Sequence, residues 1–275
     1  EGENGIQISS FNNDLTINGN GVAIDASKSF RIFKIADGIT VIIKNLTFLN
    51  GKIATQDAAI YTEAAYLELD DYAFIGNDPA QGGALYIKAG NVYTISSLYE
   101  NNTADYGGAI YVENGATLTV DGTTFKNNTA DYGGAIYVNS TDKESVLIVN
   151  NANFIENNAT ISSGAILIDD GYKVTYSTAN SLFESNSAIH SAHVDPANQW
   201  TVDAGAIYVG TNSNGTITNS KFIKNKAYDD YWSNAGAVKI SMGATITIKD
   251  STFEDNEAGY SGGAIDMQSW NNQDN

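Results

Sequence analysis

Residues 108–134, GAIYVENGATLTVDGTTFKNNTADYGG, contain one complete unit of the repeat that decides the fold of this chain. An aliphatic–tyrosine–aliphatic stretch begins at Ile110, a second alternating stretch spans 117–120, and Phe125 leads into a pair of asparagines. Period-two alternation in short stretches separated by Gly, Asn and Asp is typical of strands joined by turns. Each stretch is too short for a helix, so the unit predicts three short strands.

The same unit recurs along the chain with a shortest period of 25 residues. A small residue, an alanine and an aliphatic residue occur together eight times, and an aromatic residue lies about half a repeat away. A period of this size indicates a stacked array whose units share one core. The aromatic positions are Phe48, Phe74, Tyr99, Phe125, Phe154, Phe183, Phe222 and Phe253, and from Phe74 onward an asparagine follows three residues later, at Asn77, Asn102, Asn128, Asn157, Asn186, Asn225 and Asn256.

Stacking in register predicts columns of equivalent residues. The aliphatic columns that begin at Ile60 and at Thr62 face inward. The glycine before each alanine fits a corner that needs unusual dihedrals or close approach to the next coil. The asparagines fit another corner, where stacked amides hydrogen-bond to each other and to backbone, and where asparagine tolerates a left-handed conformation.

Two motifs carry a resemblance to known families. The G-G-A-I and F-x-x-N pair resembles the repeat of chlamydial polymorphic membrane proteins, and the whole pattern, with LTINGNG at 15–21 and GITVIIKNLTFLNG at 38–51, resembles adhesin-like surface proteins of methanogenic archaea. The resemblance covers about residues 14–267. It implies a right-handed parallel β-helix, secretion and surface attachment, and it carries over no catalytic residue.

We therefore predict an all-β, right-handed parallel β-helix of the pectate-lyase type, with roughly nine coils and three short strands per coil. At ~4.8 Å per coil the rod is ~40 Å long. Residues 1–275 form one domain, with an opening coil at 1–37, regular coils at 38–267 and a tail at 268–275. The final coil shows no evident cap, and an open strand edge invites aggregation. We expect a longer natural chain, or another element, to cover it.

Composition limits the partners. Lys and Arg total 14 against 32 acidic residues, a net charge of -18, which disfavours nucleic acid and acidic polysaccharides. No apolar run approaches the ~20 residues that cross a bilayer, so we expect no membrane insertion by this segment. With no cysteine, disulfide and thiol chemistry are excluded. We expect an extracellular, cell-surface protein whose signal peptide is absent from the sequence.

Two consecutive coils carry insertions. In most coils the glycine before alanine lies 9 or 10 positions after the aromatic, but it lies 22 positions after Phe183 and 14 positions after Phe222. Because insertions in a solenoid map to loops on one face, regions 188–203 and 227–235 are predicted neighbours. The first contains His190, His193, Asp195, Trp200 and Asp203, and the second contains Tyr228, Asp229, Asp230, Tyr231 and Trp232.

Three interpretations of this loop patch stay open. The insertions pack on each other as a small aromatic core, or they form a binding surface, since Trp and Tyr beside carboxylates suit neutral sugars or a protein hot spot. In the third, His190 and His193 with Asp195 or Asp203 hold a divalent metal. We expect no cofactor, with calcium or another divalent ion as the alternative, for example at the acidic pairs Asp70-Asp71, Asp169-Asp170 and Asp229-Asp230.

A column of aromatics lies between the two aliphatic columns and is predicted to face solvent: Tyr61, Tyr86, Tyr111, Tyr137 and Tyr208. It suits either a platform for glycans or a cross-strand ladder that stiffens the sheet, and we favour the ladder.

The function that these patterns favour is a non-catalytic, adhesin-like solenoid that binds a glycan or protein on a host cell or another microbe. The alternative is a polysaccharide-processing glycoside hydrolase, lyase or tailspike-like enzyme, in which Asp195, Asp203, Asp229 or Asp230 would act. A lyase on uronates needs a basic residue, and the chain has one arginine. Only fold analogy supports an enzyme, and a fold does not imply a function.

Overall fold

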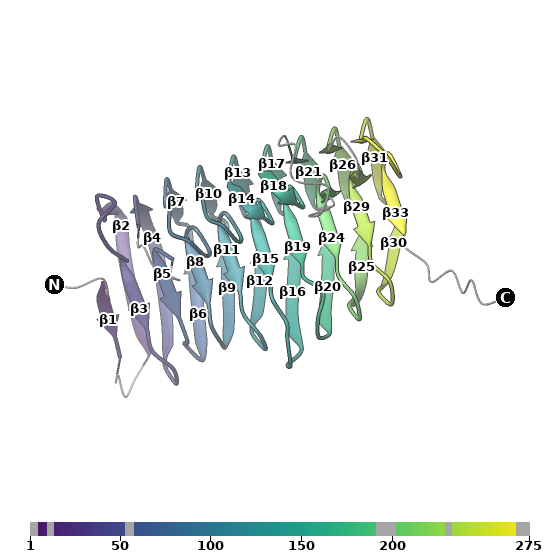
Figure 1. The fold of residues 1–275 in the computed structure, drawn as a ribbon. Helices are drawn as coiled ribbons and strands as arrows, with labels where there is room; N and C mark the ends of the chain where they lie inside the picture. The colour runs from purple at the N-terminus through teal and green to yellow at the C-terminus, as the bar shows by residue number, and fades with distance from the viewer. Residues whose placement is uncertain (1–4, 10–13, 53–57, 191–201, 229–232, 268–275) are drawn as a thin grey trace.

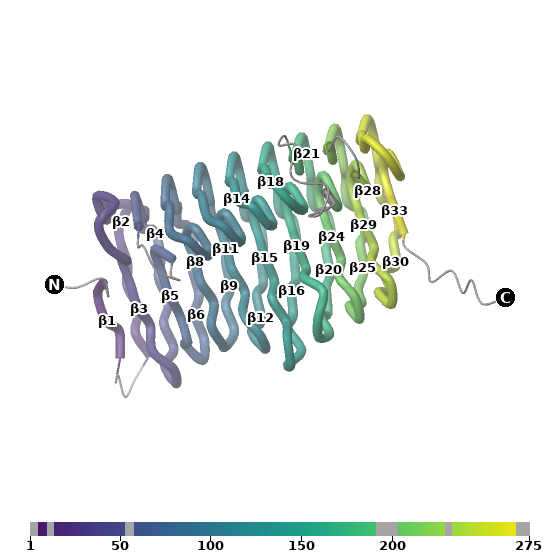
Figure 2. Tube along the Cα trace, viewed as in Figure 1, coloured from purple at the N-terminus to yellow at the C-terminus, as the bar shows by residue number. Residues whose placement is uncertain are grey.

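The computed structural model describes residues 5–9, 14–52, 58–190, 202–228 and 233–267. These residues contain no helix and form short strands that pair in parallel from one coil to the next. The coils advance along a rod from β1 (Ile6–Ile8) at one end to β33 (Ile265–Met267) at the other (Figure 1), and Figure 2 shows the same path as a tube. The parallel β-solenoid is confirmed, with about eight turns against the predicted nine.

The alternating stretch around Ile110 forms the first stack. Ten strands within the described residues pair in order, and equivalent residues face each other, as in Ile110↔Ile136 and Val112↔Val138. Along the middle of the stack the inward residues are fully buried, because the aliphatic columns face the core. The strands are β1, β3 (Phe33–Ile35), β5 (Ile60–Thr62), β8 (Leu85–Ile87), β11 (Ile110–Val112), β15 (Ile136–Val138), β19 (Ile166–Ile168), β24 (Ile207–Val209), β29 (Val238–Ile240) and β33.

Two further stacks meet at the long strands β2 (Leu15–Asp25) and β4 (Thr40–Leu49), because β4 pairs with both β6 and β7. The second stack contains β6 (Tyr66–Asp70), β9 (Asn91–Ile95), β12 (Thr117–Asp121), β16 (Ser145–Asn150), β20 (Val174–Ala179), β25 (Asn214–Thr218) and β30 (Thr245–Lys249). The third contains β7 (Ala73–Ile75), β10 (Leu98–Glu100), β13 (Thr124–Lys126), β17 (Asn153–Ile155), β21 (Leu182–Glu184), β26 (Lys221–Ile223) and β31 (Thr252–Glu254).

Later coils add a fourth strand, which the prediction of three strands per coil missed. It follows the asparagine corner, and its second residue is a buried alanine, as at Ala159, Ala188 and Ala227. The fourth stack contains β14 (Thr129–Tyr132), β18 (Asn158–Ser162), β22 (Ser187–Ile189), β27 (Lys226–Tyr228) and β32 (Glu257–Ala258), and β23 (Val202–Ala204) pairs with β28 (Ser233–Ala235) beside it.

The core is a column of stacked rings. Phe125, Phe154, Phe183 and Phe222 are fully buried, and their ring centroids are 4.7 Å apart with nearly parallel planes. This distance equals the ~4.8 Å rise between parallel strands. Each ring therefore contacts the rings above and below it, and the predicted aromatic column is the centre of the fold.

The predicted asparagine column is confirmed as a hydrogen-bonded ladder. Asn128 Nδ2 donates to Asn157 Oδ1 at 2.9 Å and to the backbone oxygen of Tyr99 at 3.0 Å. Its Oδ1 accepts from the backbone nitrogen of Asn102 at 3.1 Å and from Asn102 Nδ2 at 2.9 Å. Both ends of the amide are satisfied in a buried site, so each asparagine joins three coils.

The backbone strain at two corners lies one residue earlier than predicted. Asn101 and Asn127, which precede ladder asparagines, have φ of 56° and 53°. At the other corner Gly107 has φ of 60°, whereas Gly108 serves close approach, because a Cβ there would lie 2.3 Å from the carbonyl oxygen of Gly134. The left-handed conformation therefore falls on the neighbours of the ladder asparagines and of the packed glycines.

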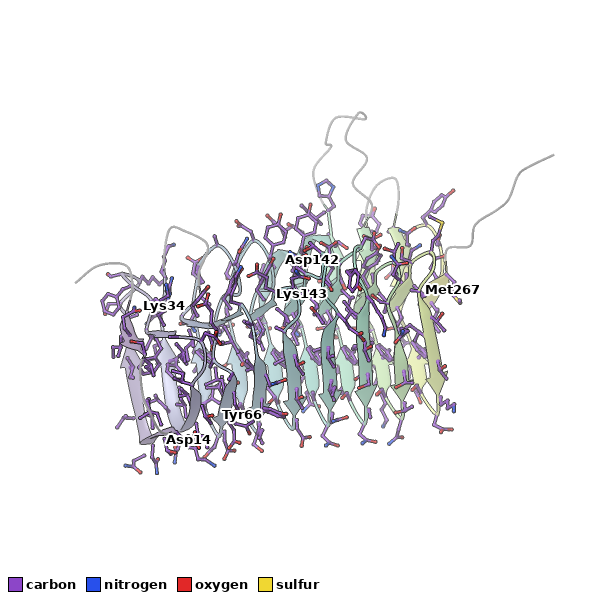
Figure 3. All side chains as sticks on the ribbon, turned by 90° about the horizontal axis from the view of Figure 1, so that it is seen from below. Asp14, Lys34, Tyr66, Asp142, Lys143 and Met267 are labelled. Carbon is purple, nitrogen blue, oxygen red and sulfur yellow. The ribbon has the colours of Figure 1, made fainter. Side chains whose placement is uncertain are left out.

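The C-terminal end of the rod is more open than its centre. Ile265 and Met267 are 36% and 67% exposed, and Figure 3 shows Met267 at this end. The predicted tail at 268–275 lies outside the described residues, and a covering element stays a prediction. Within the described part of the chain, no helix is long and apolar enough to span a bilayer.

Candidate functional site

The two insertions start and finish side by side. They leave the stack after β22 and β27, which pair through Ala188↔Ala227 and Ile189↔Tyr228. They return at β23 and β28, which pair through Ala204↔Ala235. These pairs confirm that the insertions neighbour each other where they join the rod.

Three residues of the predicted loop patch lie in the described part of the chain. The backbone nitrogen of His190 donates to the carbonyl of Tyr228 at 3.1 Å, and the Tyr228 ring, 43% exposed, lies 5.4 Å from Lys226 Nζ. Asp203 accepts from Ser162 Oγ at 2.8 Å and from Asn234 Nδ2 at 3.3 Å. The other seven fall outside the described residues: His193, Asp195, Trp200, Asp229, Asp230, Tyr231 and Trp232.

The Asp203 carboxylate anchors the base of the insertions. It joins β18, β23 and β28, because Ser162 and Asn234 donate to its two oxygens from neighbouring coils. A carboxylate held by donors on both oxygens orients the chain around it. Of the four carboxylates named for catalysis, Asp203 is the one whose position is described, and its contacts are those of a structural anchor.

Candidate metal ligands do not converge within the described residues. No group of three His, Asp or Glu side chains there has the geometry to hold a metal ion, and His193 and Asp195 fall outside that part. Two of the three acidic pairs that we considered for calcium contact protein donors instead, and the third, Asp229-Asp230, lies outside the described residues. Asp70 forms an ion pair with Lys44 at 3.1 Å, and Asp170 accepts from the Tyr208 hydroxyl at 2.7 Å.

The tyrosine column forms, but its predicted exposure is wrong. Tyr61, Tyr86, Tyr111 and Tyr137 stack with centroids 5.3, 4.8 and 5.3 Å apart. Tyr86, Tyr111, Tyr137 and Tyr208 are only 6% or 7% exposed, and Tyr61 is half-buried.

The column is buried because the segment after the asparagine corner folds across it. The Tyr106 ring meets the Tyr137 ring edge-on at 5.1 Å and stacks on Tyr132 at 5.1 Å. Strand alternation showed that the column faces away from the main core, but it could not show this covering layer. The tyrosines form a second, smaller apolar cluster, in which Leu167 of β19 occupies the position between Tyr137 and Tyr208.

Hydroxyls of the tyrosine column donate to nearby carboxylates, except at Tyr111, whose hydroxyl accepts from Asn139 Nδ2 at 2.9 Å. Tyr86 donates to Glu113, Tyr137 donates to Asp169, and Tyr208 donates to Asp170. Burial is the largest reason why the pKa values of these three tyrosines rise above the usual range. Burial also raises the pKa of the Asp169 carboxyl, because the charged form loses water.

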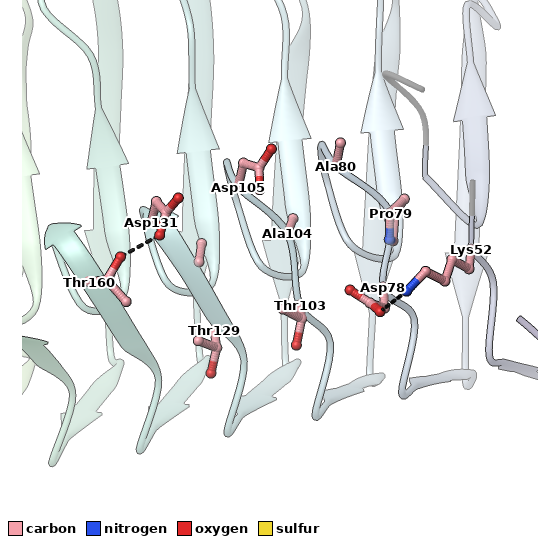
Figure 4. Close-up of a pocket in the computed structure, with 11 residues that line it drawn as sticks. Lys52, Asp78, Pro79, Ala80, Thr103, Ala104, Asp105, Thr129, Asp131 and Thr160 are labelled. Atoms are coloured by element: carbon pink, nitrogen blue, oxygen red, sulfur yellow. Dashed lines mark hydrogen bonds and ion pairs between the residues drawn. The ribbon is translucent and has the colours of Figure 1, made fainter. Parts of the chain in front are cut away.

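A groove that the sequence interpretation missed runs along the same side of the rod (Figure 4). We call it the acidic groove. Its volume is about 360 Å³ and it is lined by one short segment from each of three coils, at 78–80, 103–105 and 129–131, with Lys52 at one end and Thr160 at the other. One signal for it was visible, since NNTADYGGAIYV occurs unchanged at 101–112 and at 127–138.

Comparison with known proteins finds similarity to one repeat family. Residues 122–139 and 250–267 match the Chlamydia polymorphic membrane protein (Chlamydia_PMP) repeat. Each segment covers the same part of a coil, from the corner before the core phenylalanine to the end of the next first-stack strand. No curated protein and no solved structure matches the chain.

Proposed function

We propose that this protein is a non-catalytic, adhesin-like solenoid of the cell surface, which binds a glycan or a protein on another cell. The observation that carries the proposal is the pairing of β22 with β27 and of β23 with β28. It brings the two breaks in the repeat to one place on an otherwise regular rod. Insertions on one face of a repeat scaffold commonly form its binding surface.

The two matched segments support a surface location, because the repeat they resemble belongs to polymorphic membrane proteins. The charge of -18 agrees with neutral glycans or proteins as partners. The archaeal resemblance of the opening motifs points to the same adhesin-like role. The contacts of Asp203, which brace the insertions, agree with a binding scaffold more than with a catalytic acid.

A shortened rod gives the matched control for a binding test. Deletion of 191–201 and 229–232 places the glycine 11 and 10 positions after the aromatic, close to the 9 or 10 positions of a regular coil. We expect the full chain to bind a subset of glycans on an array, or a protein on intact cells, and the shortened rod to bind neither. Equal binding by the two proteins would overturn the proposal.

A hydrolysis assay on every bound glycan separates the adhesin from the enzyme. We expect each glycan to be recovered intact, and release of shorter sugars would establish a polysaccharide-processing enzyme instead. The double variant Trp200→Ala/Trp232→Ala tests the interpretations of the patch. Lost binding with a folded rod supports a binding surface, whereas unchanged binding supports internal packing of the insertions.

A further inference from the structure

The acidic groove lies on the same side of the rod as the insertions but on different coils. Its segments follow Asn77, Asn102 and Asn128, just as the insertions follow Asn186 and Asn225. The ladder holds this backbone in place, since each buried amide bonds to the next coil at 2.8–2.9 Å. The groove is therefore preformed, which lowers the entropy cost of binding a ligand.

The lining of the groove combines small residues with carboxylates. Ala104 and Ala130 are 8% and 2% exposed, whereas Asp105 is exposed and Asp131 is half-buried. The alanines leave room between the side chains on either side, as Figure 4 shows for Thr103, Ala104 and Asp105. The groove is thus shallow, open along its length, and negative on one wall.

One end of the groove already holds an ammonium group. Lys52 Nζ lies 2.6 Å from Asp78 Oδ2, and both residues line the groove. Farther along, the Asp131 carboxylate accepts a hydrogen bond from the Thr160 hydroxyl. Among the described lining residues Lys52 is the one cationic side chain, so Asp105 and Asp131 present their negative charge to the open space.

The wall that carries these carboxylates becomes apolar in later coils. Ile189 and Tyr228 pair across β22 and β27 and are 37% and 43% exposed. From Asp105 to Tyr228 the wall crosses four coil steps, or ~19 Å at ~4.8 Å per step. An extended peptide rises ~3.3 Å per residue, so about six residues span this length.

We propose that the acidic groove binds an extended basic peptide segment, with lysine or arginine side chains on Asp105 and Asp131 and an apolar side chain near Ile189 and Tyr228. Opposite charges steer such a segment to the groove, and its hydroxyl and alanine lining accommodates a peptide backbone without a large cavity. This site goes beyond the proposed function, because its carboxylates lie on coils without insertions, it meets only the base of the insertions at Ile189 and Tyr228, and it takes a ligand of different chemistry.

Fluorescence anisotropy with a labelled peptide tests the proposal. The probe is a six-residue peptide with lysine at alternating positions and a terminal phenylalanine, and its matched control has glutamate in place of lysine. We expect the lysine peptide to bind, the glutamate peptide not to bind, and added salt to weaken binding. Failure of the lysine peptide to bind the wild-type chain would overturn the proposal.

Two double variants locate the binding. Asp105→Asn/Asp131→Asn removes two charges but preserves shape and the acceptor for Thr160, and we expect binding about five- to tenfold weaker. Asp14→Asn/Glu254→Gln removes two exposed charges far from the groove, and we expect less than about a twofold change. Circular dichroism checks that both variants fold.

An equal loss in both double variants would show that the peptide responds to the net charge of the whole rod, and would contradict the site. The shortened rod lacks the insertions but retains the groove, so we expect it to bind the lysine peptide. Loss of glycan or cell binding by that rod leaves the groove proposal unaffected, and the two proposals can fail independently.

Discussion

The acidic groove and the base of the insertions occupy one side of the rod and differ in almost every outward side chain. In the groove the outward residues are Asp and Thr, whereas at the insertions they include Ile189 and Tyr228. Beneath both regions the aromatic stack and the asparagine ladder continue without change. The comparison teaches that the scaffold and the recognition surface vary independently, because the scaffold bonds are made inside the corner.

The ladder amide between the two regions should produce the largest effect when it is removed. In Asn157→Ala, the side chain no longer donates to the carbonyl of Phe125 or to Asn186, nor accepts from Asn128. Several buried polar groups lose their partners at once, so we expect about 3–5 kcal/mol of destabilisation. Urea denaturation measures it.

Asn153→Ala, on the half-buried outer side of the same coil, is the matched control. Its amide makes one long contact of 3.5 Å to Thr124, and we expect a change below about 0.5 kcal/mol. Similar losses for the two alanine variants would contradict a ladder that supports both regions.

The second effect concerns the end of the tyrosine column, where lysine replaces tyrosine. Lys239 is 1% exposed and pairs with Asp266. Asp266→Ala leaves a buried ammonium without its carboxylate, and we expect a loss of about 2 kcal/mol, tested by thermal unfolding. Adding Lys239→Tyr restores the ring of the column above Tyr208 and should recover most of that loss. No recovery would show that the ion pair stabilises this coil independently of the column.

A smaller effect comes from the hydrogen bonds between the hydroxyls of the tyrosine column and the neighbouring carboxylates. Tyr137→Phe retains the stacked ring but removes the hydrogen bond to Asp169, which is buried enough to have a raised pKa. We expect about 1 kcal/mol of destabilisation at neutral pH, measured by urea denaturation. Tyr172→Phe, at an exposed ring, is the control and should change stability by less than about 0.5 kcal/mol.

Alkaline pH should produce the smallest effect and test the raised pKa values of the tyrosines, both at Tyr66, which lies outside the tyrosine column, and within that column. The hydrogen bond to Glu68 raises the pKa of Tyr66 to about 12, from an ordinary value of 10.0. A raised folded pKa stabilises the protein below pH 10, and the contribution is lost as the pH rises from 10 to about 12. Circular dichroism and absorbance at 295 nm should show stability falling above pH 10, less steeply in Tyr66→Phe. Titration of all tyrosines near pH 10 without unfolding would contradict the buried column.

The repeat predicted the scaffold well because each of its positions has one physical task. The spacing from Phe125 to Asn128 recurs coil after coil, and it placed the core rings and the ladder correctly. Alternation could not reveal that Tyr106 and Tyr132 cover the tyrosine column, because it shows only the side of a strand on which a residue lies. It missed the fourth strands, whose inward residue is alanine.

The sequence indicated the surface features less completely. Unequal spacing after Phe183 and Phe222 located the insertions and predicted that they adjoin, which the pairing of β22 with β27 confirms. The acidic groove depends on the side-by-side positions of 103–105 and 129–131, and their identity in the sequence shows repetition without showing an open space between them.

The central claim is that glycan or cell recognition lies on the two insertions, while the core and the asparagine ladder support them. Binding of the full chain and of the rod without 191–201 and 229–232 to the same glycan array tests this most directly, with melting temperature as the fold check. We predict that the shortened rod melts within a few degrees of the full chain and has lost every array signal. A shortened rod that retains the signals would contradict the account.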